Sequence, residues 1–496
     1  MAAVLCLIGV VSCSRVAEEE RHVDQEFANL CLAYEAIAMF SLSNHIEKTS
    51  DDFALLRSNA LRQSLEKNMI KVSESESSQL SCESIEQALE KSGNVTKKAF
   101  YIQTLEGFVS SLDPHSRYVS EDRYEDYKNY QKNKRKSYGV TFDFHFRNHF
   151  LPLKELSVKE VLTDEAKRYL AAGDHVLAIN NIPIKDHYLK DFSEMFEDQK
   201  STITLEVEDK GKITLGRTDY NIPPIRFKVL DDDDQRYFYI GLRNFGEGMT
   251  DYFEKHYGSL YNKNTTDGVI VDLRGNPGGL LLESIRFLSH LTQQRLSVQT
   301  VGPINKPQVS ARYSLNRNYI VEPKSTFQDL PIGIQIDPNT ASAAEILAAA
   351  LKPTKAVIVG YDRTFGKGNG QQSLRLSTRN GLGGTLNLTM FRYYLNAEDT
   401  PQLHGVEPEA KISDPELEAF LQNLRKEDPS LIIHESDYEN AISIKPNSIP
   451  GGKLLSENHT LEQKTFTCDF SRSDCELDTT IMVLDFLNKS SYFEAL

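Results

Sequence analysis

The chain has 496 residues, of which 40% are hydrophobic and 26% charged, which is typical of a folded protein with about three domains. Its formal net charge of −15 at pH 7 opposes binding to phosphate backbones and to anionic membrane surfaces. Because no basic run interleaved with aromatic residues offsets this charge, nucleic acid is excluded as the main partner.

The first residues, MAAVLCLIGVVSC, form an apolar stretch that is too short to span a bilayer but fits the hydrophobic region of a secretory signal. Its ending, VVSC, resembles the lipobox of bacterial lipoproteins, which implies that Cys13 is lipidated and becomes the new N-terminus. The stretch carries no Lys or Arg, and its alternative is a buried apolar segment with an incidental cysteine. We expect a protein of the cell envelope or periplasm that touches a membrane only through this lipid anchor.

Four further cysteines remain if the apolar stretch is removed and Cys13 is acylated: Cys31, Cys82, Cys468 and Cys475. In an oxidising compartment they allow three pairings. We favour a disulfide between Cys468 and Cys475, which closes a short loop, and unpaired thiols remain the alternative. No Cys/His pattern has the spacing of a zinc site.

Residues 20–115 show a mainly helical pattern, with apolar residues three and four apart in FANLCLAYEAIAMF and KKAFYIQTLEGFVSSL. The repetitive segment SESESSQLSCES between them is expected to be a loop or a flexible connection. The polar segment SLDPHSRYVSEDRYEDY then ends the helical region. From about residue 137 to 217 the pattern changes to short strands, YGVTFDF, LSVKEVL, ITLEVE and KITLGR, with one helix in DEAKRYLAAGDHVLAINNIPI.

After a link, NIPPIRFKVLDDDDQ, strands and helices alternate as in an α/β fold. YFYIGLRNF and GVIVD are expected as strands, and EGMTDYFEKHYGSLY and LLLESIRFLSHL as helices. The turn LRGNPGG precedes the second helix, and its glycines let backbone amides approach a ligand closely. A tight turn between strand and helix explains the same glycines, and both roles can hold together.

Residues 332–372 contain the clearest candidates for catalytic side chains, a hydroxyl and an amine. IGIQI and AVIVG are expected as buried strands, and the Ala/Leu-rich segment up to Leu351 as a helix. Ser342 therefore lies where a strand leads into a helix N-terminus, at which free N–H groups and the helix dipole stabilise a developing oxyanion. Lys367, in the glycine-rich segment TFGKGNG, is an amine that can activate this hydroxyl.

Each of these residues has an alternative explanation. Ser342 and Glu345 match the S-x-x-E pattern of a capping box, which satisfies the first N–H groups of a helix. Lys367 fits a solvated loop lysine or a phosphate-binding P-loop. The P-loop fails because five residues separate Gly360 from Gly366 and because Gly368 follows the lysine.

The segments TASAAEI, AVIVG, TFGKGNGQ, DLRGNPGG, SLDPHSRY and LHGVEPE together resemble the C-terminal processing (tail-specific) serine peptidases, over about residues 110–412. Lys367 follows Ser342 by 25 positions, the separation expected of that family's serine and lysine. By the same match, Gln371 falls where the family places a glutamine that orients the lysine. Glu345 stays open between helix cap and active-site support.

The resemblance also implies an oxyanion hole, formed by the backbone N–H of Ala343 and that of Gly278 or Gly279. For catalysis Lys367 must be neutral, so its pKa must lie far below the usual value of about 10.4. Metals and organic cofactors are not needed for Ser-Lys chemistry.

The run AAGDHVLAINN resembles the PDZ domains of these peptidases. The match places a carboxylate-binding loop at Tyr138, Gly139, Val140, Thr141 and Phe142. In such a loop, consecutive backbone N–H groups capture a free C-terminal carboxylate while the peptide adds as a strand to the sheet edge. Thr141 stands where a second glycine is usual, which bears on affinity and preference. The alternative is a small β-domain that only packs.

We therefore predict a multidomain α/β serine endopeptidase with a crotonase/ClpP-like core and an inserted PDZ domain, which cleaves envelope or secreted proteins with free, apolar C-termini. An adaptor or a second copy of the chain is a further expected partner. The alternatives are a catalytically silent PDZ-bearing scaffold on the same fold, and an acyl-CoA enzyme of the crotonase type. The expected regions are a signal peptide at 1–13, a helical region at 14–115, a PDZ domain at 116–220, a peptidase core at 221–412 and an extension with a terminal helix at 413–496.

Overall fold

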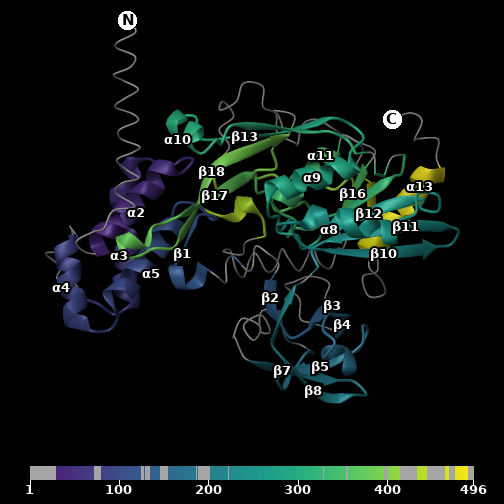
Figure 1. Cartoon of the computed structure of the whole chain (residues 1–496), viewed down its shortest axis with the longest axis horizontal. Helices are drawn as coiled ribbons and strands as arrows, with labels where there is room; N and C mark the ends of the chain where they lie inside the picture. The colour runs from purple at the N-terminus through teal and green to yellow at the C-terminus, as the bar shows by residue number, and fades with distance from the viewer. Residues whose placement is uncertain are drawn as a thin grey trace, which may run out of the picture.

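The computed structural model describes residues 30–71, 80–124, 128, 134–145, 155–185, 187, 201–221, 223–324, 326–327, 329–352, 356–395, 400–413, 433–443, 464–467 and 475–489. Figure 1 shows a mixed α/β protein, with an N-terminal helical region, a large α/β body and a small β-rich domain. Cys13 and Cys468 fall outside the described residues, so their predicted lipidation and disulfide are not addressed. No helix among the described residues is both long and apolar enough to cross a membrane.

The N-terminal region is helical, as predicted. Its helices are α2 (Leu30–Asn44), α3 (Phe53–Lys67), α4 (Cys82–Ser92) and α5 (Lys97–Ser110). The expected loop SESESSQLSCES is wrong at its end, because Ser81 accepts a hydrogen bond from Ser84 N at 3.2 Å and so begins α4. A disulfide joins Cys31 in α2 to Cys82 in α4.

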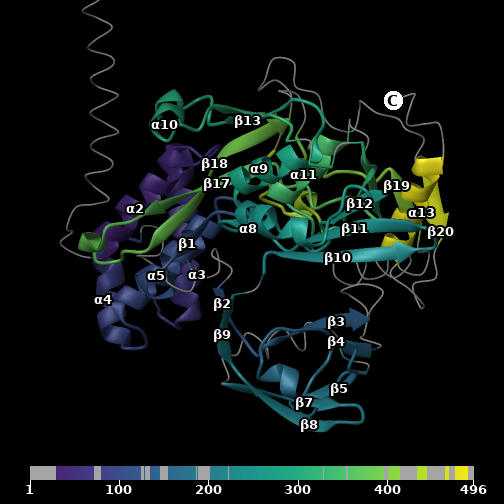
Figure 2. The same ribbon diagram turned by 45° about the vertical axis from the view of Figure 1, so that its right-hand side comes forward.

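The small domain is built mainly from strands (Figure 2). Its buried residues form a hydrophobic core separate from those of the rest of the chain. The strands are β2 (Lys134–Ser137), β3 (Val140–His145), β4 (Glu155–Val161), β5 (Val176–Ile179), β6 (Ile182–Pro183), β7 (Thr202–Val207), β8 (Gly211–Gly216) and β9 (Thr218–Asn221). The four predicted strands are confirmed. The predicted helix is reduced to a 3₁₀ turn at Ala166–Arg168, since the following residues enter β5.

A seven-stranded sheet forms the centre of the large body, in the order β10-β11-β12-β15-β16-β19-β20. Its strands are β10 (Ile225–Asp232), β11 (Gln235–Leu242), β12 (Gly268–Asp272), β15 (Ile332–Gln335), β16 (Ala356–Gly360), β19 (Ala410–Ser413) and β20 (Lys464–Thr467). All are parallel except the edge strand β10, which pairs antiparallel with β11. The predicted link NIPPIRFKVLDDDDQ is therefore wrong for β10: Ile225 is buried, Phe227 and Leu230 are half-buried, and the strand pairs with β11 along its whole length despite its acidic end.

Helices cover both faces of this sheet. Phe238 and Ile240 face a core shared with α8 (Met249–His256), α9 (Leu281–Leu291) and α11 (Ala343–Leu351). Tyr237 and Tyr239 point to the other face, where Leu484 of α13 (Cys475–Lys489) packs. Burial on both faces is typical of parallel sheets and explains the continuous apolar runs in their sequences.

A second sheet joins the helical region to the large body. Its order is β1-β18-β13-β14, and β17 also pairs with β18. The strands are β1 (Arg117–Val119), β13 (Leu296–Val301), β14 (Arg317–Val321), β17 (Asn369–Arg375) and β18 (Thr385–Leu395). Leu386, Leu388 and Met390 of β18 pack into the core of the N-terminal helices. The N-terminal helices therefore pack against β18, and β18 in turn pairs with β17, the strand that contains Gln371.

Candidate active site

Ser342 lies between β15 and α11, as the sequence predicts. Its φ and ψ are +55° and −118°, which is rare for a residue with a Cβ atom. An ordinary capping serine has extended backbone angles, so helix capping alone does not account for this conformation. Strain of this kind, about 1–3 kcal/mol, is concentrated at functional sites.

Glu345 connects Ser342 to the segment that contains Lys367. Its buried carboxylate accepts hydrogen bonds through Oε2 from Ser342 N at 2.7 Å and Lys367 N at 2.8 Å. Through Oε1 it accepts from Gly366 N at 2.7 Å and Thr364 Oγ1 at 2.6 Å. Burial raises the pKa of Glu345 to about 7, although these four hydrogen bonds act in the opposite direction. Glu345 is therefore both a cap of α11 and a support of the site.

Lys367 is oriented by Gln371, because its Nζ donates a hydrogen bond to Gln371 Oε1 at 2.8 Å. Burial lowers the pKa of Lys367 to about 8. The charges of Glu435 and Asp113 act in the opposite direction, and that of Arg117 reinforces the lowering. This lowered pKa increases the fraction of the amine that is neutral near neutral pH, which is the form that a general base requires.

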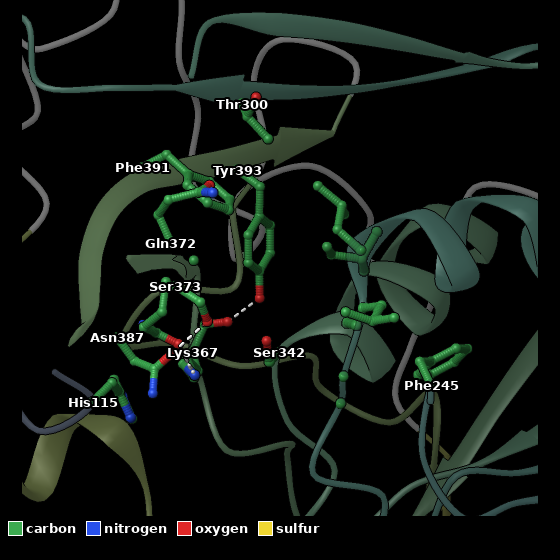
Figure 3. A pocket seen from close by; sticks show the side chains of 18 of the residues that line it. His115, Phe245, Thr300, Ser342, Lys367, Gln372, Ser373, Asn387, Phe391 and Tyr393 are labelled. Carbon is green, nitrogen blue, oxygen red and sulfur yellow. Dashed lines mark hydrogen bonds between the residues drawn. The ribbon is translucent and has the colours of Figure 1, made fainter. Parts of the chain in front are cut away.

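Ser342 and Lys367 line one cavity of about 830 Å³ (Figure 3). In this view Lys367 lies to the left of Ser342, Phe245 lies to the right, and Tyr393 points down toward Ser342 from above. Apolar residues of the wall include Phe245, Leu280, Ile346 and Phe391. The cavity has the size and the mixed lining of a ligand site.

The two predicted oxyanion glycines differ in their hydrogen bonds. The N–H of Gly278 donates to Asn276 Oδ1 at 2.9 Å. The backbone of Gly278 and Leu280 pairs with Phe245 on both sides of Gly279, so the N–H of Gly279 faces away from Phe245. Gly279 is therefore the better donor for an oxyanion.

Gly278 has another role, since a Cβ atom there would lie 2.8 Å from Ser342 Cβ and 2.9 Å from Ala343 N. The absence of a Cβ atom at Gly278 thus lets the glycine turn lie close to Ser342 and to the predicted donor Ala343.

Several residues at the site were not predicted. Tyr393 lines the cavity, and its hydroxyl donates to Lys367 O. Burial raises the pKa of Tyr393 well above its ordinary value. His115 also lines the cavity, with its Nε2 2.6 Å from Glu435 Oε2. His115 belongs to the quoted segment SLDPHSRY, but Glu435 lies in an extension whose sequence gave no signal.

The predicted carboxylate-binding loop lies apart from these residues, and none of Tyr138, Gly139, Val140, Thr141 and Phe142 lines the cavity. Gly139 has a φ of +79°, and a Cβ atom there would lie 2.1 Å from Thr163 Oγ1. Only glycine fits this position.

The chain is similar in sequence to several known proteins. Residues 236–412 match the model of peptidase family S41. A carboxy-terminal-processing protease of Bartonella bacilliformis is 27% identical over 331 residues, which cover 64% of this chain and 70% of that protein. A carboxyl-terminal-processing protease of Picosynechococcus is 30% identical over 224 residues, covering 44% of this chain, and the match spans about half of that relative, 51%.

Among solved structures, a putative S41 protease from Bacteroides fragilis is similar with a TM-score of 0.45 and 19% identity, over 63% of this chain and 82% of that one. With the motifs quoted above, the sequence matches show that this chain carries a peptidase family S41 domain at residues 236–412 and is similar in sequence to carboxy-terminal-processing proteases.

Proposed function

We propose that this protein is a serine endopeptidase in which Ser342 is the nucleophile, Lys367 the general base and Gln371 the group that orients the base. The observation that carries the proposal is the shared carboxylate of Glu345, which fixes the backbone of Ser342 and of Lys367 on one cavity. A lysine whose pKa is lowered to about 8 and that lies in the same cavity supplies the base.

In this mechanism Lys367 Nζ takes the proton of Ser342 Oγ as the oxygen attacks the scissile carbonyl carbon. The N–H groups of Ala343 and Gly279 stabilise the negative charge on the carbonyl oxygen. The lysine ammonium then protonates the leaving amine, and an ester to Ser342 remains. Water, deprotonated by Lys367, then attacks this ester; the lysine ammonium returns the proton to Ser342 Oγ as the ester bond breaks, and the acid is released.

The test is cleavage of a permanently unfolded protein by the wild type and by Ser342→Ala. We expect fragments only from the wild type. Equal cleavage by both proteins would assign the activity to another residue or to a contaminant. A soluble, folded wild type that cleaves no unfolded substrate would favour the catalytically silent scaffold.

We further propose that the small domain is a PDZ domain that binds the free, apolar C-terminal tail of a substrate. Among the described strands, β3 pairs with β4, and in a PDZ domain a bound peptide adds as a further strand to a sheet edge. Gly139, at the start of β3, has the left-handed backbone that a carboxylate-binding turn requires.

A crotonase/ClpP-like core, the region boundaries given above and export to the cell envelope belong to the same proposal. The disulfide between Cys31 and Cys82 supports an oxidising compartment, because such bonds persist mainly in secreted and periplasmic proteins.

A further inference from the structure

A buried hydrogen-bond chain continues from the lysine into the N-terminal region. Gln371 Nε2 donates to Thr389 Oγ1 at 3.0 Å, and Thr389 Oγ1 donates to Asp113 Oδ1 at 2.9 Å. Asp113 Oδ2 lies 2.8 Å from His45 Nε2. Asp113, Thr389 and His45 are fully buried.

The far end of this chain has a fixed proton arrangement. His45 Nδ1 accepts from the backbone N–H of Glu47 at 3.1 Å and of Lys48 at 3.0 Å, so the proton of the neutral ring is on Nε2 and points at Asp113. Asp113 also accepts through Oδ1 from the N–H groups of His115 and Ser116. Burial alone would raise the pKa of Asp113, but the hydrogen bonds from His45, from Ser116 and from the backbone of His115 hold it well below its usual range.

An ionised carboxylate can only accept hydrogen bonds, and this sets the direction of the whole chain. Thr389 must turn its O–H toward Asp113, which leaves only lone pairs for Gln371. Gln371 must then present its NH₂ group to Thr389 and its carbonyl oxygen to Lys367. The amide orientation at the base is thus decided by a carboxylate two hydrogen bonds away.

We propose that Thr389 and Asp113 are positioning residues for the lysine base: they lock Gln371 in the one orientation that accepts a Lys367 N–H and so directs the amine lone pair at Ser342. This inference rests on the proposed Ser-Lys mechanism. It makes the segment after α5 and the N-terminal helices part of the catalytic apparatus, although they precede the S41 domain at 236–412.

The alternative is that these buried groups only stabilise the junction between α2, α5 and β18. A merely structural network would lower stability when broken, and kcat per folded molecule would stay unchanged. The two roles therefore differ in a measurable way.

The experiment compares Thr389→Val, which removes the hydroxyl at nearly constant shape, with Thr389→Ser, which keeps it. Thr104→Val is the matched control, because Thr104 is also fully buried and, among the described residues, its hydroxyl donates to Phe100 O within its own helix α5. kcat and KM on an unstructured peptide, and thermal unfolding, are measured for all three and the wild type.

We expect Thr389→Val to lower kcat about 10- to 100-fold, the loss typical of a misplaced catalytic group, with KM within about twofold. Thr389→Ser should stay within about threefold of the wild type, and Thr104→Val should keep its kcat while losing stability. A Thr389→Val enzyme that is folded and keeps wild-type kcat would overturn the proposal, as would failure of Thr389→Ser to restore the rate.

The pH profile gives a second readout. Without Thr389 to hold it, the Gln371 amide can turn its NH₂ to the amine, which favours the neutral lysine. The acid limb of kcat/KM should then move to lower pH while the plateau falls. The charged groups that act on Lys367, namely Glu435, Asp113, Glu345 and Arg117, are all retained in this variant. An unmoved limb would contradict reorientation of Gln371.

Failure of the proposed function is recognised separately. A wild type without Ser342-dependent cleavage would refute the dyad before any of these variants is compared.

The variant Asp113→Asn tests the carboxylate itself. The asparagine side chain can donate to Thr389, so the direction of the hydrogen-bond chain can reverse. We expect the same loss of kcat and the same shift of the acid limb as in Thr389→Val. A folded Asp113→Asn enzyme with wild-type kinetics would refute the role of the carboxylate.

Discussion

The backbone N–H groups of Ser342 and Lys367 donate to the same oxygen, Glu345 Oε2, at 2.7 and 2.8 Å. One carboxylate thereby holds together the two chain segments that carry the proposed nucleophile and the proposed base. The side chains project from these anchored positions into one cavity. Several consequences of this arrangement can be measured.

Glu345→Gln should lower both stability and kcat. An amide in place of the carboxylate would direct its own N–H groups at backbone donors, and unsatisfied buried groups cost about 1–3 kcal/mol each. Glu409→Gln is the control, because Glu409 Oε2 accepts one backbone N–H, from Ile358, at 3.1 Å. Thermal unfolding and peptide cleavage measure the two effects. Wild-type kcat in a folded Glu345→Gln enzyme would show that the shared carboxylate does not set the catalytic geometry.

The pH dependence follows from the lysine. Protonated Lys367 cannot accept the Ser342 proton, so kcat/KM should be low in acid and rise with pH through a single ionisation near the lowered pKa of about 8. The profile of kcat/KM reports the free enzyme and is measured on a short unstructured peptide. A rate that is constant from about pH 6 to 10 would exclude a lysine base with this pKa.

The glycine turn gives a steric test. In Gly278→Ala the new Cβ atom would lie 2.7 Å from Ala341 O and 2.8 Å from Ser342 Cβ, so the nucleophile must move. Gly275→Ala is the control, since Gly275 also has a positive φ, of +68°, but a Cβ atom there meets nothing within 4 Å. Both variants carry backbone strain, and only Gly278→Ala should lose kcat, by about 100-fold or more. Equal losses in the two variants would attribute the effect to backbone strain alone.

The continuous stretch 332–372 could be predicted from the sequence because its strands are β-branched runs, its helix is Ala/Leu-rich and its serine and lysine lie in one motif. Strand β10 could not, because its acidic end and the prolines before it are typical of a loop. Its strand conformation depends on pairing with β11.

The sequence also did not predict that Thr389, Asp113 and Glu435 lie near Lys367, for a different reason. Thr389 and Asp113 are 276 positions apart, and only the fold brings them together. Glu435 lies in a segment without a motif. Its backbone N–H nevertheless donates to the carbonyl oxygen of Phe365, which lies in the segment TFGKGNG two residues before Lys367. Hydrogen bonds between distant segments leave no periodic pattern in a single sequence.

Tail recognition is tested by one change to the substrate. Hydrogen bonds to an ionised acceptor are roughly twice as strong as those to a neutral one, so amidating the C-terminus of a substrate with an apolar tail should raise its KM. The intact enzyme is used with the acid and the amide of one peptide. Deleting residues 137–217 should abolish the difference between the two substrates. Equal KM values for the acid and the amide in the intact enzyme would show that the loop at Gly139 does not bind the C-terminal carboxylate of the substrate.

The Ser-Lys dyad is tested most directly by a double-mutant cycle. Turnover of an unfolded protein is measured for the wild type, Ser342→Ala, Lys367→Ala and the double variant, after thermal unfolding has shown that all four fold. Because neither residue works without the other, each single change should lower kcat about 10⁴-fold or more, and the double variant should be no slower than either. Near wild-type turnover by Lys367→Ala, or losses that multiply in the double variant, would contradict a nucleophile and base that act as one unit.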